Sequence, residues 1–335
     1  MAPMKYFYEL TVSSSPHAHG KQTTQTIMRD VLIALLPALV GAVYFFGFRA
    51  LVVTVVSAAA CVFFEWAYRK MLKLDSTVWD LSAVVTGVLV AYVCPVTVPL
   101  WMIIIGDFFA IVIVKQLFGG IGQNFVNPAL AGRAFMFISW AGAMGGTWAK
   151  PGFQNAVGLF QTTLTDANSC ATPLGAMHAG SMPDCSVLDA FLGNVGGCLG
   201  ETSVALLLLG GLYLVARRVI SCRIPLTFMA TVFVLGVLFP QGNDPLTWGA
   251  LQLCTGGVVL GAIFMATDYV TSPVTKLGQI IFGIGCGVIT IVIRYFGSFP
   301  EGVSFAILVM NTCVVLLDMV GRPKKFGAPK KEAKK

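Results

Sequence analysis

The sequence predicts an all-α polytopic membrane protein with about ten transmembrane helices. Of its 335 residues, 56% are hydrophobic and only 11% are charged, and the mean hydropathy is +0.81. A soluble domain carries about 25% charged residues, so this chain lacks the polar side chains needed to face water on all sides. Its apolar residues also form long runs rather than amphipathic stripes, which is typical of segments that cross a bilayer.

These apolar runs define the expected helices in chain order. Each is close to the ~20 residues that a bilayer requires, although the third, fourth, fifth and seventh are short. The predicted spans are Ile27–Phe46, Leu51–Ala67, Leu81–Cys94, Leu100–Val114, Pro128–Met144, Leu199–Ala216, Leu226–Phe239, Trp248–Ala266, Lys276–Ile293 and Val303–Val320. The chain therefore divides into a polar leader (residues 1–26), a membrane domain (27–320) with a long loop at 145–197, and a basic, disordered tail (321–335).

Lysine and arginine collect in alternate loops, and this asymmetry predicts the orientation. Such loops lie in the cytoplasm under the positive-inside rule. They hold Arg69, Lys70, Lys73, Lys115, Arg217, Arg218, Arg223 and Lys276, and the basic tail falls on the same side. The opposite loops together contain only Lys150, with Arg49 and Arg294 as exceptions near span ends. We therefore expect both termini in the cytoplasm and the 145–197 loop outside. The net charge of +7 reflects this bias, so we expect no nucleic-acid partner.

Two helix starts stand beside breaks in the apolar pattern. In "NFVNPALAGR", Asn127 has the place of an N-cap and Pro128 the first helical position, and "TSPVTKLGQ" repeats the device with Ser272 and Pro273. The Gly-rich "KQLFGGIGQN" precedes the first. Broken backbone at membrane depth is tolerated only where protein or a watery cavity covers it, and helix N-termini there favour anionic or strongly polar ligands. Plain turns between helices explain the spacing equally well.

Acidic residues within the apolar runs mark a second kind of candidate site. An acid at the bilayer centre costs at least ~2.5 kcal/mol, so it usually faces a cavity or a partner. Glu65 lies in such a run. Asp107 and Asp268 are candidates for ion coupling or for a buried polar network. Asp318 lies near the cytoplasmic edge, where an ion pair with Arg322 is expected. The motifs "GDFFA" and "ATDYV", each upstream of a proline helix start, hint at an internal repeat.

Metal ligands are not arranged in a recognisable set. The nine cysteines show no C-x-x-C spacing, and most fall in apolar runs where a thiol acts as a small hydrophobe. His17 and His19 form an H-x-H pair without a third ligand nearby, which favours a polar leader over a zinc site. We expect no metal site in this chain.

Several motifs in order closely resemble a known family. They are "SSPHAHGKQTTQTIMRDVLIALLPA", "FGGIGQNFVNPALAGRAF", "SCATPL", "ATDYVTSPVTKLGQIIFG" and "IRYFGSFPEGVSFAILVMN". The family is NqrB/RnfD, which takes in RnfD of the Rnf ion-translocating electron-transport complex and NqrB of the sodium-pumping NADH:quinone reductase. The resemblance covers almost the whole chain, and the short N-terminus is more similar to RnfD than to NqrB.

The resemblance gives a meaning to the small polar loop "LTDANSCATPLGAMH". Family members carry FMN bound through its phosphate to a threonine hydroxyl, in a segment like D-x-x-S-G-A-T that a flavin transferase recognises. The matching residues here are Asp166, Ser169, Cys170, Ala171 and Thr172, with Thr172 as the attachment point and Cys170 where Gly is usual. From the residues alone, the segment reads only as a small polar loop in which Pro173 stiffens the exit.

The resemblance also implies a role within a larger assembly. It implies a multi-pass subunit of the bacterial or archaeal cell (inner) membrane that relays electrons between flavins. The complex couples ferredoxin oxidation and NAD+ reduction to Na+ or H+ transport. Iron–sulfur clusters, a further FMN, and the NAD and ferredoxin sites would lie on partner subunits.

A non-covalent riboflavin among the helices is also implied, with the breaks at residues 119–127 and 271–273 as its candidate sites. Two alternatives remain at this point: a subunit of the quinone-linked pump, and a solute channel or transporter without redox chemistry.

Overall fold

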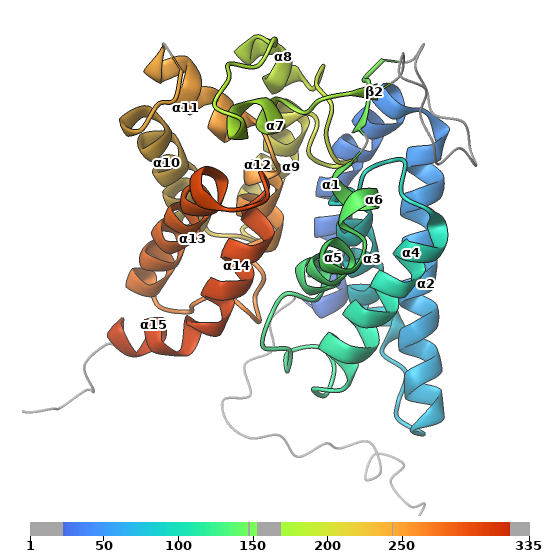
Figure 1. Ribbon diagram of the computed structural model, residues 1–335. Coiled ribbons are helices and arrows are strands. Elements are labelled where there is room, and N and C mark those ends of the chain that lie inside the picture. Colours follow the sequence, from blue (N-terminus) through green and yellow to red (C-terminus); the bar gives the residue numbers. More distant parts are fainter. Residues whose placement is uncertain (1–22, 147, 153–168, 243, 322–335) are drawn as a thin grey trace, which may run out of the picture.

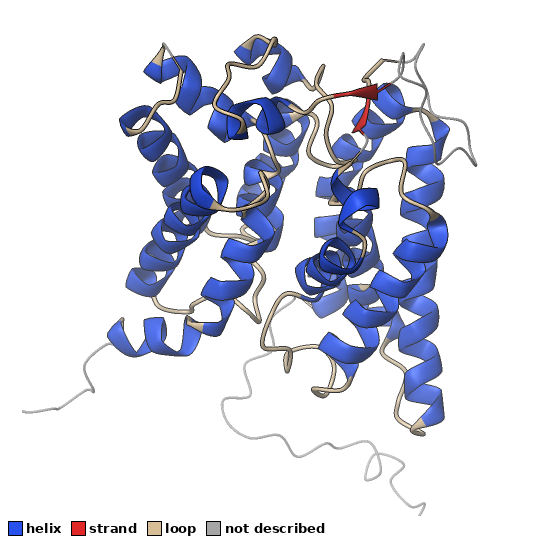
Figure 2. Ribbon diagram, in the orientation of Figure 1, coloured by secondary structure: helices blue, strands red, loops and turns tan. Residues whose placement is uncertain are grey.

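The computed structural model describes residues 23–146, 148–152, 169–242 and 244–321. Helices make up nearly all of its regular structure, which confirms the mainly helical prediction (Figure 2). The described residues add one antiparallel pair of two-residue strands, β1 (Trp148–Ala149) and β2 (Ser169–Cys170). Asp166, the two leader histidines and residues 322–335 of the predicted tail lie outside the described residues.

The first half of the chain forms one group of helices, on the right in Figure 1. Its elements are α1 (Thr24–Phe46), α2 (Phe48–Met71), η2 (Val78–Asp80), α3 (Ser82–Tyr92), α4 (Leu100–Phe108), the π-helix η3 (Phe109–Gln116), α5 (Pro128–Ser139) and α6 (Ala141–Gly145). α2 packs against both α3 and α4, and α5 packs against η3. The approach of α2 and α3 is close because residue 87 is a glycine, whose missing Cβ would overlap the backbone of Ala58.

The second half forms a second group, joined to the first by α7 (Pro173–His178) and α8 (Val187–Leu192) at the top of Figure 1. Its further elements are α9 (Val204–Ala216), α10 (Arg223–Leu238), α11 (Pro245–Cys254), α12 (Val258–Leu260), the π-helix η6 (Gly261–Met265), α13 (Lys276–Phe296), α14 (Val303–Thr312) and α15 (Val314–Val320). α10 packs along α13 and α11, while the pairs α1–α9 and α5–α14 join the two halves.

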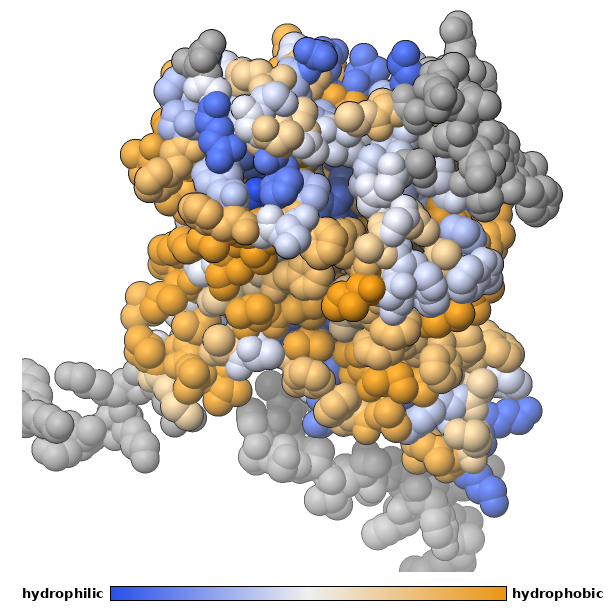
Figure 3. Space-filling model, viewed as in Figure 1, coloured by the Kyte–Doolittle hydropathy of each residue, from blue (hydrophilic) through white to orange (hydrophobic). Residues whose placement is uncertain are grey.

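The apolar helices identify a membrane protein. Three described helices, α1, α2 and α13, are long and apolar enough to cross a bilayer, and two bent pairs bring the number to five. Figure 3 shows an apolar belt across the middle of the molecule, with hydrophilic residues gathered above it and a smaller group below. This distribution is the one expected of a protein whose middle faces lipid.

Two of the predicted spans are broken rather than continuous. The pair α11 and α12/η6 is bent by 59°, and the pair α14 and α15 by 60°. The first break lies at Gly256 and Gly257, whose φ values of 66° and 70° are left-handed and interrupt the helix. At the second, the N–H of Cys313 bonds to the oxygen of Met310 over 3.0 Å, a tightened turn that redirects the helix. The expectation of continuous helices over 248–266 and 303–320 was therefore wrong.

Two helix starts also differ from their predicted positions. α9 begins at Val204 rather than Leu199, because the preceding backbone is held to the end of α3 by a bond from Gly200 N to Tyr92 O (2.9 Å). α13 begins at Lys276 with Thr275 as its N-cap, not at Ser272 and Pro273. In contrast, Asn127 and Pro128 begin α5 as predicted, with Asn127 Oδ1 accepting from Ala129 N at 3.0 Å.

The two arginines that did not fit the charge rule are buried against backbone carbonyls. Arg49 of α2 donates to the oxygens of Val96 (2.6 Å) and Val98 (3.0 Å), in the loop before α4. Arg294 of α13 donates to the oxygens of Gln252 (2.5 Å) and Thr255 (2.8 Å), at the break before α12. Each guanidinium therefore satisfies carbonyls that the interrupted backbone leaves without a helical partner.

Candidate functional site

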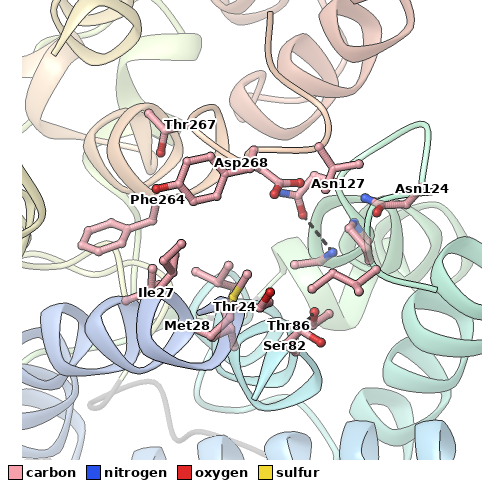
Figure 4. Close-up of a pocket in the computed structure, with 18 of the residues that line it drawn as sticks. Thr24, Ile27, Met28, Ser82, Thr86, Asn124, Asn127, Phe264, Thr267 and Asp268 are labelled. Carbon is pink, nitrogen blue, oxygen red and sulfur yellow. Dashed lines mark hydrogen bonds between the residues drawn. The ribbon is translucent and has the colours of Figure 1, made fainter. Parts of the chain in front are cut away.

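A cavity of about 380 Å³ lies where the two halves meet. Its volume falls within the range of small-molecule sites, roughly 300–1,000 Å³. The walls come from α1, α3, η3, the turn before α5, α9 and η6 with the turn that follows it. The lining includes Thr24, Ile27, Met28, Ser82, Val85, Thr86, Lys115, Gly122, Asn124, Asn127, Phe264, Thr267, Asp268 and Tyr269. Figure 4 shows Asn124, Asn127 and Asp268 on one side of this space and Ser82 and Thr86 on another.

The Gly-rich break at residues 119–127 forms part of this wall. Gly119, Gly120 and Gly122 all have positive φ values (116°, 94° and 88°), so the chain can turn sharply between η3 and α5. Asn127 ends the turn, and its side-chain amide donates to the oxygen of Met265 at 3.2 Å. The break is thus covered by protein and opens on a cavity, as backbone at this depth requires.

The second predicted break lies against the first through Asn311 of α14. With its amide turned to satisfy its neighbours, Asn311 accepts from Asn127 N (3.1 Å) and donates to Thr271 O (3.0 Å). Residues 271–273 do not line the cavity themselves, but Asp268, Tyr269 and Val270 just before them do. The two segments singled out from the sequence therefore meet at one site.

A π-helix lies on each side of this site. η3 leads into the Gly-rich turn, and η6 leads into the turn at Asp268. π-helical turns are rare and occur frequently at functional sites. In both halves, a loop or break held by a buried arginine precedes a short helix and then a π-helix. Asp107 lies before its π-helix and Asp268 after its own, so "GDFFA" and "ATDYV" are not equivalent in this arrangement.

Of the two acids proposed for ion coupling, only Asp268 reaches the cavity. Its Oδ2 accepts from the Thr271 hydroxyl at 3.1 Å. Asp107 of α4 is fully buried between helices, where its Oδ1 accepts from Ser57 Oγ at 2.8 Å. Its Oδ2 has no hydrogen-bond partner among the described residues.

Glu65 and Lys115 form a buried ion pair that the sequence did not indicate. Lys115 Nζ lies 2.7 Å from Glu65 Oε2 and 2.7 Å from Ser82 Oγ, and both Lys115 and Ser82 line the cavity. Charge counting alone assigned Lys115 to a cytoplasmic turn. A usable signal was the spacing of Ser57, Cys61 and Glu65, four residues apart on one buried face of α2.

Asp318 has a structural role in the described part of the chain. Its carboxylate accepts from the N–H groups of Val274 and Thr275, each at 3.0 Å, and so holds the turn that precedes α13. Its expected partner Arg322 lies outside the described residues.

Thr172 lies far along the chain from the cavity walls, in the loop that carries α7. It is the N-cap of α7, and its Oγ1 accepts from Gly175 N at 3.0 Å. The side chain is half-buried, and Ala171 beside it is exposed. Cys170 of β2 directs its Sγ toward the oxygens of Trp148 (3.8 Å) and Ala149 (3.6 Å), and Ser169 pairs with Ala149 in β1.

A small pocket beside Thr172 contains two carboxylates. Glu201 and Glu301 line it together with Thr172. Ligand atoms of Cys198, Glu201 and Glu301 lie within 4.8 Å of one another. The guanidinium of Arg133 forms an ion pair with Glu301 and also contacts Ser304. A cation already stands at this group, so the arrangement fits an ion pair joining α5 to the segment before α14 better than a metal centre.

Fold and cavity together define a helical membrane protein with a small-molecule site between two halves. The chain belongs to the NQR2, RnfD, RnfE family, whose model matches residues 11–327.

Relatives with printed activities match over nearly their full lengths. The chain is 48% identical to the subunit designated D of the Na+-translocating ferredoxin:NAD+ oxidoreductase complex of Acetobacterium woodii, over 97% of this chain and 98% of the relative. It is 40% identical to the subunit of the same letter in the proton-translocating ferredoxin:NAD+ oxidoreductase complex of Clostridium ljungdahlii, over 95% and 96%. It is also 40% identical to its counterpart in the ion-translocating oxidoreductase complex of Stutzerimonas stutzeri, over 92% and 93%.

Proposed function

We propose that this chain is the RnfD component of an ion-translocating ferredoxin:NAD+ oxidoreductase complex and relays electrons between flavins in the membrane. The main support is the 48% identity to such a component over 332 residues, with both chains covered almost completely. The quinone-linked pump of the same family is the alternative within this class. The electron donor distinguishes them: purified membranes should couple reduced ferredoxin, not quinone, to NAD(H).

We propose that FMN is attached to Thr172 through a phosphoester. The residues present fit this group, because the hydroxyl is half-buried, its neighbour Ala171 is exposed and small, and an ester oxygen can still accept from Gly175 N. Asp166, Ser169, Cys170 and Ala171 would be read by the flavin transferase. Mass spectrometry of the peptide spanning residues 168–178 should show an added FMN mass that is absent in Thr172→Ala. An unmodified wild-type peptide from cells containing the transferase would rule out this assignment.

We propose a second, non-covalent flavin, riboflavin, in the 380 Å³ cavity. Apolar side chains such as Ile27, Met28 and Phe264 suit the faces of a planar ring, while Asn124 and Asn127 offer amides to its polar edge. Bound flavins would supply the one- and two-electron chemistry. The described residues hold the ring, exclude water from its faces and fix the charges around it. Extraction of the denatured complex should release riboflavin in about equal amount to covalent FMN.

The finer topology is part of the proposal. Ten spans, with both termini in the cytoplasm of a bacterial or archaeal cell, would place Thr172 outside and the cavity on the cytoplasmic side. The partners would be the cluster-carrying membrane subunits, the other FMN-carrying subunit, the NAD- and ferredoxin-side subunits, and lipids. Asp107 and Asp268 are proposed to couple electron transfer to Na+ or H+ movement; the relatives include both a Na+-translocating and a proton-translocating complex.

A solute channel without redox chemistry is the alternative from another class, and broken helices with buried acids support it. One measurement separates the two. The denatured, purified chain should appear as a fluorescent flavin band on a gel if Thr172 is modified, and a channel gives no such band.

A further inference from the structure

A continuous line of hydrogen-bonded side chains connects the loop after α2 with the cavity. The Thr77 hydroxyl donates to Glu65 Oε1 at 2.5 Å. Lys115 Nζ donates to Glu65 Oε2 and to Ser82 Oγ, each at 2.7 Å. Thr77 is half-buried in the loop, whereas Glu65, Lys115 and Ser82 are 1%, 4% and 7% exposed. One end of the line therefore lies at an accessible loop and the other at the cavity wall.

Fold stability alone gives a weak reason for this arrangement. A buried ion pair often stabilises a protein no more than well-packed apolar residues of the same volume would. Lys115 also belongs to the π-helix η3, and its carbonyl accepts from Gly120 N at 3.0 Å, where the Gly-rich turn begins. The rare helical form thus carries the residue whose ammonium group faces the cavity, a position typical of a functional role.

We propose that Thr77, Glu65, Lys115 and Ser82 form a path that delivers protons to a reducible ring bound in the cavity; this rests on the proposed non-covalent flavin. The ring receives electrons from the preceding carrier of the complex. Lys115 then gives one proton: an Nζ–H bond breaks and an N–H bond forms on the ring, directly or through the Ser82 hydroxyl. The neutral amine regains a proton through Glu65, which draws it from water at Thr77, so one proton leaves the solvent for each proton delivered.

The other acid on the cavity wall does not offer such a route in the described structure. Asp268 bonds to the hydroxyl of Thr271, which is itself 3% exposed, and to the adjacent backbone of Tyr269 and Val270. Its contacts are therefore local. Only the line through Lys115 and Glu65 reaches an accessible loop residue among those described.

The test uses the whole purified complex with Glu65→Gln and Thr77→Val. Glu65→Gln keeps the side-chain shape but cannot relay a proton, and Thr77→Val removes the hydroxyl at the accessible end. Thr54→Val is the matched control, because Thr54 is also buried on α2 but its hydroxyl bonds only to Ala50 O of its own helix (2.8 Å). Riboflavin content, the rate of its reduction by reduced ferredoxin, and the infrared difference spectrum on reduction are measured for each.

We expect both path variants to retain riboflavin and to reduce it at least about tenfold more slowly, since positioned proton transfer contributes factors of roughly 10²–10⁴. The wild-type spectrum should contain a carboxyl band that Glu65→Gln abolishes, while Thr54→Val matches the wild type in every measurement. Full riboflavin content with wild-type reduction rates in Glu65→Gln and Thr77→Val would overturn the path. If Glu65→Gln fails to assemble, the half-buried Thr77→Val decides. A wild-type complex without riboflavin would instead overturn the cavity assignment on which the path rests.

Discussion

The side-chain amide of Asn127 and the main-chain oxygen of Met265 form a hydrogen bond of 3.2 Å across the two halves of the chain. Asn127 begins α5 and Met265 ends η6, so this bond connects a helix start in one half to a π-helix in the other. Both ends lie at the cavity, and the Asn127 carboxamide oxygen is also the N-cap of α5. One side chain therefore shapes the helix start, the contact between halves and the cavity wall.

Substitutions at Asn127 should separate these roles. Asn127→Ala removes the cap and the bond between halves, with an expected loss of about 2 kcal/mol in the free energy of unfolding, about 1 kcal/mol for each. Asn127→Asp keeps the cap but has no amide donor for Met265, so about half of that loss is expected. Thermal unfolding and extracted riboflavin check both variants, and both should lose riboflavin. Ser186→Ala, which removes the cap of α8 away from the cavity, should keep it; full riboflavin in both Asn127 variants would contradict this view.

Neutralising the two buried acids should impair coupling without preventing assembly. An Asn at position 107 can still accept from Ser57, and an Asn at 268 can still accept from Thr271, so packing is kept. The lost charge can no longer offset the dehydration of a passing cation. We expect covalent flavin at the wild-type level in Asp107→Asn and Asp268→Asn, with fewer ions moved per electron. Electron transfer from ferredoxin to NAD+ in membrane vesicles, with ion uptake followed in parallel, gives the ratio. Wild-type uptake in both variants would assign these acids to packing.

The orientation can be checked with reporter fusions after Lys150 and after Lys335. Positive loops stay in the cytoplasm, so the first fusion should report the outside and the second the cytoplasm. Reports from the same side would mean that the number of spans between them is wrong by an odd number.

The reactivity of Cys170 should reveal its environment next to Thr172. Partial burial raises the pKa of the Cys170 thiol, with Lys150 acting in the opposite direction. Since only the thiolate reacts and its fraction falls as the pKa rises, alkylation at pH 8 should be slower than for an unperturbed thiol of pKa about 8.5 and should speed up toward higher pH. Its Sγ contacts the Trp148 and Ala149 oxygens, so Cys170→Gly should leave modification of Thr172 unchanged. Rapid alkylation at pH 7, or loss of the FMN mass in Cys170→Gly, would contradict this placement.

Local signals were predictable from the sequence, and distant ones were not. The start of α5 was predicted correctly because Asn127 and Pro128 act within one turn of the helix. The start of α13 was misplaced because Asp318, 44 residues from Val274, holds the preceding turn. The same limit applies to the site. The breaks near Asn127 and Thr271 were visible in the residues, whereas the pair of Glu65 and Lys115 joins residues 50 apart.

The walls of the cavity have a consequence for how the protein is made. They combine residues near position 27 with residues near position 268, so the site cannot exist until the last of these segments has entered the membrane. A cofactor in the cavity would then be loaded late in biogenesis and would hold the two halves together. Ligand present at 100 times its Kd stabilises a fold by about 2.7 kcal/mol, an amount that would set the lifetime of newly inserted chains under riboflavin shortage. Vitamin supply would thereby control the abundance of this protein as well as its activity.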